Sequence, residues 1–424
     1  MDAARRSRLR IHLPRPGAYG QGGREDGGAA PARRRRRHAA AALDRPEQLQ
    51  CRIRDALATP DAPAWRSHAV AAPLRVRGGA PDHSGIEPGC RSPRVSLISE
   101  QRSNKGEVMA LDLHLAGFLE SLAGSGAKPL PQSTPAEARG LMQHLARAVR
   151  APEAVVDIHG VEDLTVPGAA GSLRARLYRP TQERDLPTVV YLHGGGFVIG
   201  DLDTHDNICR ELARGANAVV VSVDYRLAPE HPYPAAADDA IAATRWVIAN
   251  AGELGGSDVV AVAGDSAGGN LAAVVTQQLH ADGISLSAQF LIYPAVAQDR
   301  SGFPSFKENG EGYFLDLETI AWFERHYVLD GTDREEPRLA PIRAKDLAGL
   351  PPAVILTAEF DPLRDEGEAY GRLLHASGVK VDTIRCDGMI HGFFDMGAIS
   401  PGAQAWIEKG IASFRKVLGG ARHH

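Results

Sequence analysis

Cysteine is scarce in this sequence, and long hydrophobic runs are absent. Only 4 of the 424 residues are cysteine, and they form no C-x-x-C pair and no metal-ligand spacing: Cys51, Cys90, Cys209 and Cys386. No stretch of 18 or more apolar residues occurs, and charged, proline-rich sequence follows Arg5 where a secretory signal would be apolar. We therefore expect a reduced, disulfide-free, cytoplasmic protein that is not embedded in a membrane.

Charge is distributed unevenly between two parts of the chain. Residues 1–108 carry about twice as many Lys and Arg as Asp and Glu, and they include the run Arg33–Arg37. Because this part shows neither helical nor strand periodicity, we interpret it as disordered. The codons of Lys105-Gly106-Glu107 can spell a purine-rich ribosome-binding stretch, so we also interpret this part as a translated upstream leader, with the natural start at Met109. The remaining residues are acidic overall, which argues against nucleic acid or an anionic membrane as a partner.

Short apolar runs rich in Val and Ile alternate with helix-prone segments in residues 109–424. The predicted strands are Leu173–Tyr178, Thr188–Leu192, Ala218–Asp224, Val259–Ala263, Gln289–Tyr293, Ala353–Thr357 and Val381–Arg385. The predicted helices are Asn207–Gly215, Ala235–Ala251, Ala267–Ala281, Asp365–Ser377 and Ala403–Leu418. This alternation predicts an α/β fold, in which helices cover both faces of a mostly parallel sheet.

Two segments interrupt the alternation. One is the amphipathic segment Leu111–Ala151, and the other is Asp299–Asp330. Aromatic residues are rare in the chain, at 6% of all residues, yet the second segment contains Phe303, Phe306, Tyr313, Phe314, Trp322, Phe323 and Tyr327. Such a cluster predicts an apolar lid over a pocket, although an ordinary helical excursion with aromatic core residues stays open.

A serine stands on a predicted strand-to-helix turn. The motif Gly264-Asp265-Ser266-Ala267-Gly268-Gly269 follows the predicted strand Val259–Ala263 and runs into a helix-prone segment. A sharp turn of this kind exposes the serine hydroxyl above the sheet, so Ser266 is predicted to be a nucleophile. A glycine-rich turn that only packs or binds a phosphate is the alternative, although the motif does not match G-x-G-x-x-G.

A serine nucleophile needs a base and a group that orients the base. Asp361 follows the predicted strand Ala353–Thr357, and His391 follows the next one. The chain order Ser266, Asp361, His391 is that of an α/β-hydrolase triad. Asp365 competes with Asp361 but suits a helix N-cap better, and a lone histidine in a loop is often only a surface residue.

The motif His193-Gly194-Gly195-Gly196-Phe197 follows the predicted strand Thr188–Leu192. Glycines without Cβ atoms let the backbone aim two amide donors at one point, where the N–H of Ala267 can join them. This predicts an oxyanion hole, in which His193 braces the loop by hydrogen bonds.

These motifs resemble those of the bacterial hormone-sensitive-lipase-like esterases, in the branch that carries GDSAGG. Besides the motifs above, the resemblance rests on Asp224–Ala235, Asp361–Asp365 and His391-Gly392-Phe393, and it extends over about residues 109 to 420. It implies the α/β-hydrolase fold, with a helical cap built from about residues 109–150 and 299–330.

The resemblance also implies roles for individual residues. Ser266 would be the nucleophile, His391 the general base and acid, and Asp361 the orienting carboxylate. The oxyanion hole would consist of Gly195, Gly196 and Ala267. We assign Arg226 and Glu230 a structural role in locking the loop that holds them.

We therefore predict a serine carboxylesterase that hydrolyses short- to medium-chain acyl esters through an acyl-enzyme, without a metal or an organic cofactor. Amide or carbamate hydrolysis uses the same machinery, and a non-enzymatic small-molecule receptor on the same fold is the rival from another class. A homodimer is left open. A true lipase is disfavoured because the polar, acidic sequence shows no apolar surface that would seek a lipid interface.

Overall fold

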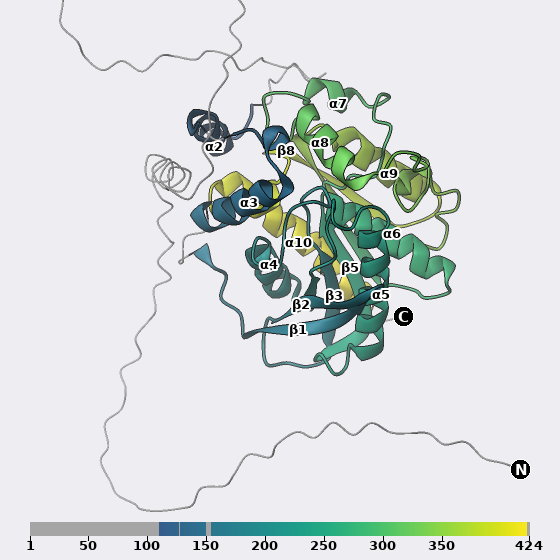
Figure 1. Ribbon diagram of the computed structural model, residues 1–424. Helices are drawn as coiled ribbons and strands as arrows, with labels where there is room; N and C mark the ends of the chain where they lie inside the picture. Colours follow the sequence, from purple (N-terminus) through teal and green to yellow (C-terminus); the bar gives the residue numbers. More distant parts are fainter. Residues whose placement is uncertain (1–109, 127, 150–153, 422–424) are drawn as a thin grey trace, which may run out of the picture. The chain divides into compact units, whose positions relative to one another are not determined.

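The computed structural model describes residues 110–126, 128–149 and 154–421 (Figure 1). The hypotheses of a disordered segment or leader over residues 1–108, and of a start at Met109, lie outside the described residues. Within the described part of the chain, no helix is both long enough and apolar enough to cross a bilayer.

The described residues contain one sheet of eight strands in the order β1-β2-β4-β3-β5-β6-β7-β8. The strands are β1 (Gly160–Gly168), β2 (Gly171–Arg179), β3 (Leu186–Leu192), β4 (Val219–Val223), β5 (Gly256–Asp265), β6 (Ala288–Ile292), β7 (Ala353–Phe360) and β8 (Val381–Ile390). β1 and β2 pair antiparallel, β2 pairs antiparallel with β4, and all later pairs are parallel. The predicted fold class is confirmed.

All seven predicted strands coincide with observed strands, and β1 was missed. Residues of β3, β4 and β6 are buried without exception, which produces the continuous apolar runs that sequence analysis detects. In β1 only Val166 is buried, because this strand lies at the sheet edge and exposes most of its side chains. Its sequence therefore resembles a polar loop.

Helices alternate with the parallel strands. The α-helices are α2 (Leu113–Gly124), α3 (Pro135–Val149), α4 (Asp206–Ala216), α5 (Ala235–Asn250), α6 (Ala267–Ala281), α7 (Pro304–Glu308), α8 (Leu317–Tyr327), α9 (Arg364–Ala376) and α10 (Pro401–Ala421). Short 3-10 turns are η1 (Leu130–Gln132), η3 (Pro341–Arg343) and η4 (Phe393–Asp395). The described residues of the segment Leu111–Ala151 thus form α2, η1 and α3, and the segment Asp299–Asp330 forms α7 and α8.

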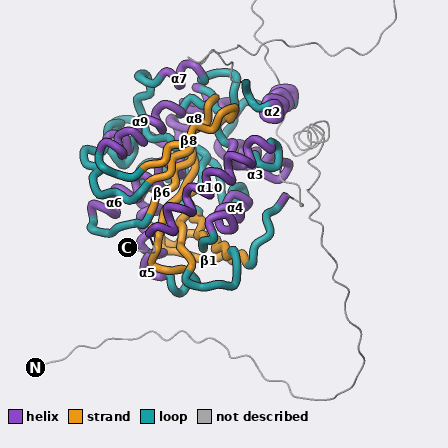
Figure 2. The backbone as a smooth tube through the Cα atoms, turned by 180° about the vertical axis from the view of Figure 1, so that it is seen from behind, coloured by secondary structure: helices purple, strands orange, loops and turns teal. Residues whose placement is uncertain are grey.

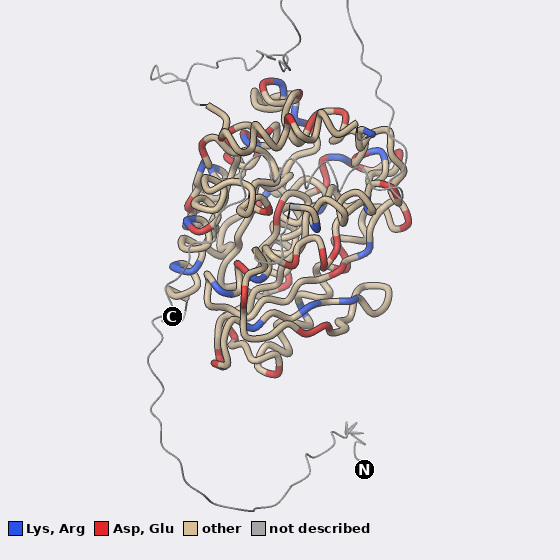
Figure 3. The backbone as a smooth tube through the Cα atoms, turned by 90° about the vertical axis from the view of Figure 1, so that its left-hand side faces the viewer, with Lys and Arg blue, Asp and Glu red and all other residues tan. Residues whose placement is uncertain are grey.

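Alternate side chains of each strand enter different cores, because successive residues of a strand point to opposite faces. Val190 and Val262 pack with residues of α5, α6 and α9, whereas Val189 and Ala263 pack with residues of α4 and α10. The helices therefore form two layers around the sheet, as Figures 1 and 2 show. Acidic and basic residues are interspersed along the surface turns and helices in Figure 3.

The two segments that interrupt the alternation meet each other. The indole Nε1 of Trp322, in α8, donates a hydrogen bond to the carbonyl oxygen of Ser133 at 3.2 Å. Trp322 is 2% exposed, so this contact between η1 and α8 is buried. Segments about 190 residues apart in sequence therefore lie side by side.

Candidate active site

Ser266 connects β5 directly to α6. Its backbone has φ +53° and ψ −116°, a conformation that a residue with a side chain rarely adopts. The backbone N–H of Ser266 donates to the carbonyl of Ile292 at 2.9 Å, which ties the turn to the end of β6. Such strained residues persist only where the surroundings hold them, and they concentrate at active sites.

The turn brings α6 against the end of β3. A Cβ at Gly268 would lie 1.9 Å from the carbonyl oxygen of Leu192, a distance that no side chain tolerates. The glycine of the motif is therefore required by close approach of two backbones. This approach places Ser266 next to the loop that follows β3.

The structure brings Ser266, His391 and Asp361 together in one hydrogen-bonded chain. His391 Nε2 lies 2.9 Å from Ser266 Oγ, and His391 Nδ1 lies 2.8 Å from Asp361 Oδ2. Because the Asp361 carboxylate accepts at Nδ1, Nε2 is left to accept the proton of the serine hydroxyl. Asp361 is fully buried, and its Oδ1 accepts from the backbone N–H of Leu363 at 2.8 Å.

Asp365 lies elsewhere, and the expectation that it caps α9 is wrong. The N-cap of α9 is Leu363, and Asp365 is the second residue of the helix. Its Oδ2 accepts from the backbone N–H of Ser305 at 2.8 Å, and its Oδ1 accepts from Arg364 Nε at 2.8 Å. The turn at Asp361 begins the helix earlier than the sequence suggests, so the Asp365 carboxylate joins α9 to α7 instead.

The oxyanion loop, which we define as residues 193–201, follows β3. Gly195 has φ +109° and Gly196 has φ +58°, so the chain here uses conformations that favour glycine. Gly195, Gly196 and Ala267 line the same cavity as Ser266 and His391. Ala267 is the first residue of α6, so its N–H has no acceptor within the helix.

A buried carboxylate next to Ser266, that of Asp265, holds the start of the oxyanion loop. Asp265 Oδ1 accepts from the Tyr191 hydroxyl at 2.6 Å and from the backbone N–H of Gly194 at 2.8 Å, and it lies 3.6 Å from His205 Nε2. Burial alone would raise the pKa of Asp265, but the facing His205 and the hydrogen bonds lower it. Burial opposes charge on His205, yet Asp265 raises the pKa of that imidazole.

The pKa of His193 is lowered, whereas that of His205 is raised. Its ring is fully buried and stacks on Tyr225 with centroids 4.3 Å apart, and its Nδ1 lies 2.8 Å from the carbonyl oxygen of Gly194. Burial, followed by the charge of His205, lowers the pKa of His193 to about 4. A neutral ring that bonds its own loop agrees with the bracing role predicted from the sequence.

The outer side of the oxyanion loop packs against α8. Phe197 has φ +63°, and its ring stacks on Tyr327 with centroids 3.9 Å apart and planes 8° apart. A Cβ at Gly196 would lie 2.2 Å from the ring of Phe323, so that ring rests directly on the loop backbone. Aromatic residues of the segment Asp299–Asp330 are therefore part of the wall beside Ser266.

A cavity of about 550 Å³ lies over Ser266. Its lining is mostly apolar and comes from α2, η1, α3 and α8 together with the residues around the serine. Arg300 also lines it, but this guanidinium is buried and pairs with Glu366 and Glu324, each at 2.7 Å. The arrangement suits a small molecule that is largely apolar.

The segment Asp224–Ala235 is tied down by ion pairs at two points. Arg226 Nε lies 2.6 Å from Asp239 Oδ2, and the Asp239 side chain is fully buried. Glu230 pairs with Arg139 of α3 at 2.7 Å. These contacts agree with the structural role assigned to Arg226 and Glu230.

The sequence did not predict that Tyr191 and His205 support the oxyanion loop through Asp265. Asp265 lies within the quoted motif, but nothing in the sequence indicates that Tyr191 and His205 are its partners. Both residues are buried in neighbouring elements, and their pairing depends on the order of strands in the sheet. A histidine just before a predicted helix was the available signal, and it points to no partner.

Comparison with known proteins adds an independent observation. A family model described as the alpha/beta hydrolase fold matches residues 189–395. The esterase LipI of Mycobacterium tuberculosis is 48% identical over 267 residues, which cover 61% of this chain and 83% of the relative. The chain belongs to this family, in its hormone-sensitive-lipase-like branch.

Further relatives show the same relationship. The carboxylesterase NlhH of Mycobacterium tuberculosis is 47% identical over 277 residues, which cover 64% of this chain and 83% of the relative. A solved hyperthermophilic esterase from the archaeon Pyrobaculum calidifontis is 44% identical and superimposes with a TM-score of 0.70, covering 73% of this chain and 99% of that one. As a member of this esterase family, the protein is a carboxylic ester hydrolase.

The pairing of His205 with Asp265 predicts a pH-dependent contribution to the stability of this esterase. Because the pKa of His205 is raised in the folded state, its contribution is fully present below the ordinary histidine value of about 6.5. The contribution is lost as the pH rises through the raised value. The wild type should therefore exceed His205→Gln in unfolding free energy by the largest amount at acidic pH. This difference should decrease as the pH rises.

Urea denaturation at a series of pH values between 5 and 9 measures this difference. The exposed His375 of α9 supplies the control variant His375→Gln, for which we expect no comparable narrowing. A difference that stays constant over the whole pH range would contradict the charged pair.

Proposed function

We propose that this protein is a serine carboxylesterase that hydrolyses short- to medium-chain acyl esters through an acyl-enzyme intermediate. The observation that carries the proposal is the hydrogen-bonded chain from Ser266 through His391 to Asp361, with distances of 2.9 and 2.8 Å, facing a largely apolar cavity. The names of the relatives, esterase LipI and carboxylesterase NlhH, support the same reaction class.

Acylation begins when Ser266 Oγ attacks the ester carbonyl carbon and His391 Nε2 takes the hydroxyl proton. The resulting imidazolium is stabilised by Asp361, which also keeps the ring in the required orientation. The carbonyl oxygen becomes negatively charged, and the amides of Gly195, Gly196 and Ala267 bind it. His391 then gives its proton to the departing alcohol oxygen, which leaves the acyl group on Ser266.

Deacylation repeats these steps with water as the nucleophile. His391 Nε2 removes a proton from water, the hydroxide oxygen bonds to the acyl carbon, and the same amides hold the second oxyanion. The bond to Ser266 Oγ breaks, and Ser266 recovers its proton from His391. The products are the carboxylic acid and the alcohol, and every proton is transferred through one imidazole.

The preference for short to medium acyl chains rests on the cavity. Its volume of about 550 Å³ is within the range of roughly 300–1,000 Å³ that is typical of small-molecule sites. We propose that about residues 109–150 and 299–330 form a cap that closes this cavity. Leu122 and Leu141 line it from one segment and Ile320 lines it from the other, so an acyl chain would be enclosed between them.

Replacement of the nucleophile separates an esterase from a receptor that only binds esters. For Ser266→Ala, turnover of an aryl acetate should fall by roughly 10⁴-fold or more, because no other group can form the acyl-enzyme. A fluorophosphonate probe should label the wild type at Ser266 and leave the variant unlabelled, as intact-mass and peptide mass spectrometry would show. Substantial turnover by a pure, folded Ser266→Ala protein would refute the assignment.

Asp361 and Asp365 form a matched pair of test positions only four residues apart. Asp361→Asn should lower kcat by about 10³–10⁴-fold, because an amide favours the wrong tautomer of His391. Asp365→Asn should leave kcat within roughly 2-fold, since that carboxylate bonds Ser305 and Arg364 and not His391. Steady-state kinetics of both purified variants gives the comparison, and equal losses at both positions would contradict the proposed roles.

A series of p-nitrophenyl esters from acetate to palmitate measures the acyl preference. We expect kcat/KM to be highest between acetate and octanoate and to fall at least about 10-fold by laurate, because methylenes that do not fit cost about 1–3 kcal/mol of discrimination. An increase in activity on emulsified long-chain triglycerides would overturn the short-chain preference while leaving the serine mechanism intact.

A further inference from the structure

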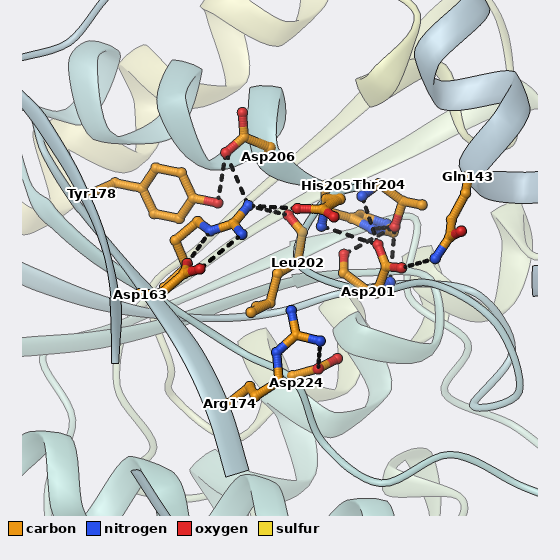
Figure 4. A network of polar contacts seen from close by, with 12 residues as sticks. Gln143, Asp163, Arg174, Tyr178, Asp201, Leu202, Thr204, His205, Asp206 and Asp224 are labelled. Atoms are coloured by element: carbon orange, nitrogen blue, oxygen red, sulfur yellow. Dashed lines mark hydrogen bonds and ion pairs between the residues drawn. The ribbon is translucent and has the colours of Figure 1, made fainter. Parts of the chain in front are cut away.

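Helix α3 directs two polar side chains at the oxyanion loop. Arg139 and Gln143 are four residues apart, so they lie on one face of the helix. Arg139 Nε donates to the carbonyl oxygen of Val198 at 2.8 Å, and Gln143 Nε2 donates to Asp201 Oδ2 at 2.6 Å. Figure 4 shows the second contact, in which Gln143 extends from its helix to the carboxylate of Asp201.

The guanidinium of Arg139 also joins the oxyanion loop to the loop Asp224–Ala235. Its NH2 group donates to the carbonyl oxygen of Ala228 at 2.8 Å, and its two terminal nitrogens bond both carboxylate oxygens of Glu230 at 2.9 and 2.7 Å. The backbone N–H of Ala228 in turn donates to the carbonyl oxygen of Phe197 at 2.9 Å. One rigid, planar side chain therefore sets the distance between the two loops.

The hydrogen bond from Arg139 to Val198 affects the glycines of the loop indirectly, through the backbone hydrogen bonds to Gly195. The backbone N–H groups of Val198 and Ile199 both donate to the carbonyl oxygen of Gly195, at 3.0 and 2.9 Å. That carbonyl belongs to the peptide unit whose N–H is that of Gly196. A displacement of Val198 would therefore rotate the Gly196 amide, which is one of the donors assigned to the oxyanion hole under the proposed function.

The bond at Asp201 fixes the other end of the loop. Asp201 Oδ1 accepts from the backbone N–H groups of Asp203 and Thr204, at 3.0 and 2.8 Å, and its second oxygen is the one that Gln143 bonds. Thr204 is followed by His205, the partner of Asp265. The loop is thus held from outside by α3 and from below by the buried carboxylate.

We propose that Arg139, supported by Gln143, is a positioning residue for the oxyanion hole. Helix α3 then has a second role besides lining the substrate cavity: it sets the orientation of the amide donors that stabilise the transition state. Amide donors are effective only within about 2.7–3.1 Å of the developing oxyanion, so a small displacement of the loop is costly. The inference rests on the oxyanion hole assigned under the proposed function.

The test compares Arg139→Met, which keeps an apolar stem but removes every donor, with Arg139→Lys, which keeps the charge and one donor group. Arg139→Met should lower kcat for p-nitrophenyl acetate by about 10- to 100-fold, less than complete loss of a donor, with KM within roughly 2-fold. The same factor should apply to hexanoate. Arg139→Lys should recover part of the loss.

A transition-state mimic distinguishes positioning from a general structural defect. An aliphatic trifluoromethyl ketone adds to Ser266 as a hemiketal, whose oxyanion needs the same amides. Its inhibition constant should rise in Arg139→Met by the same factor by which kcat falls. Thermal melts and the stoichiometry of fluorophosphonate labelling show whether each variant is folded and keeps a reactive serine.

Two further variants sharpen the comparison. Arg147→Met, eight residues along the same helix and exposed, should behave as the wild type. Gln143→Leu removes only the bond to Asp201 and should lower kcat by a smaller factor than Arg139→Met. If Arg139→Met does not fold, Arg139→Lys and Gln143→Leu provide the same measurements.

Two outcomes would overturn the inference. In one, kcat of the Arg139 variants does not differ from that of Arg147→Met; in the other, only KM and the acyl-chain preference change. Failure of the proposed function itself would be recognised separately, as turnover that survives in Ser266→Ala. The two failures therefore cannot be confused.

Discussion

The bonds of the Asp265 carboxylate are the constraint on which the active site depends. This residue is covalently adjacent to Ser266, and it accepts a hydrogen bond from the backbone N–H of Gly194, near the start of the oxyanion loop. Ser266 and the oxyanion loop are therefore held relative to each other through one buried group. A buried carboxylate is costly without partners, and Tyr191 and His205 supply them from β3 and from the start of α4.

Around this centre, the chain holds the same loop from three directions. His193 and Tyr225 stack inside it, Phe323 and Tyr327 of α8 pack on its outer side, and Arg139 of α3 bonds its backbone. A loop rich in glycine would otherwise sample many conformations, because glycine loses the most backbone entropy on ordering. The surrounding contacts restrict that freedom, so the amides are oriented before a substrate binds.

Sequence analysis succeeded where the physical signal is local. β3 to β7 are short apolar runs because both of their faces are buried, and the glycine motifs mark turns that no larger residue could form. Ser266, Asp361 and His391 could be placed together because each follows a parallel strand, and the carboxyl ends of such strands meet at one edge. The strand-to-helix turn at Ser266, the glycine loop after β3 and the order of the helices were predictable for these reasons.

The features that could not be predicted depend on tertiary contacts, which produce no periodic pattern in the sequence. β1 reads as a loop because its side chains face solvent, and Asp365 was expected to cap a helix that in fact begins at Arg364. Arg139 looks like any basic residue on an amphipathic helix, since its acceptors at Val198 and Ala228 are backbone oxygens far along the chain. Backbone acceptors carry no residue-specific signature, so such bonds can be found only in three dimensions.

The ring of Phe323 has two neighbours at once, the substrate cavity and the backbone of Gly196. A ligand that fills the cavity tightly would press this ring against the backbone of Gly196, whose N–H we propose to bind the oxyanion. Substrate size would then affect kcat more than KM. On the proposed mechanism, an ester that displaces this ring would react slowly even when it is bound.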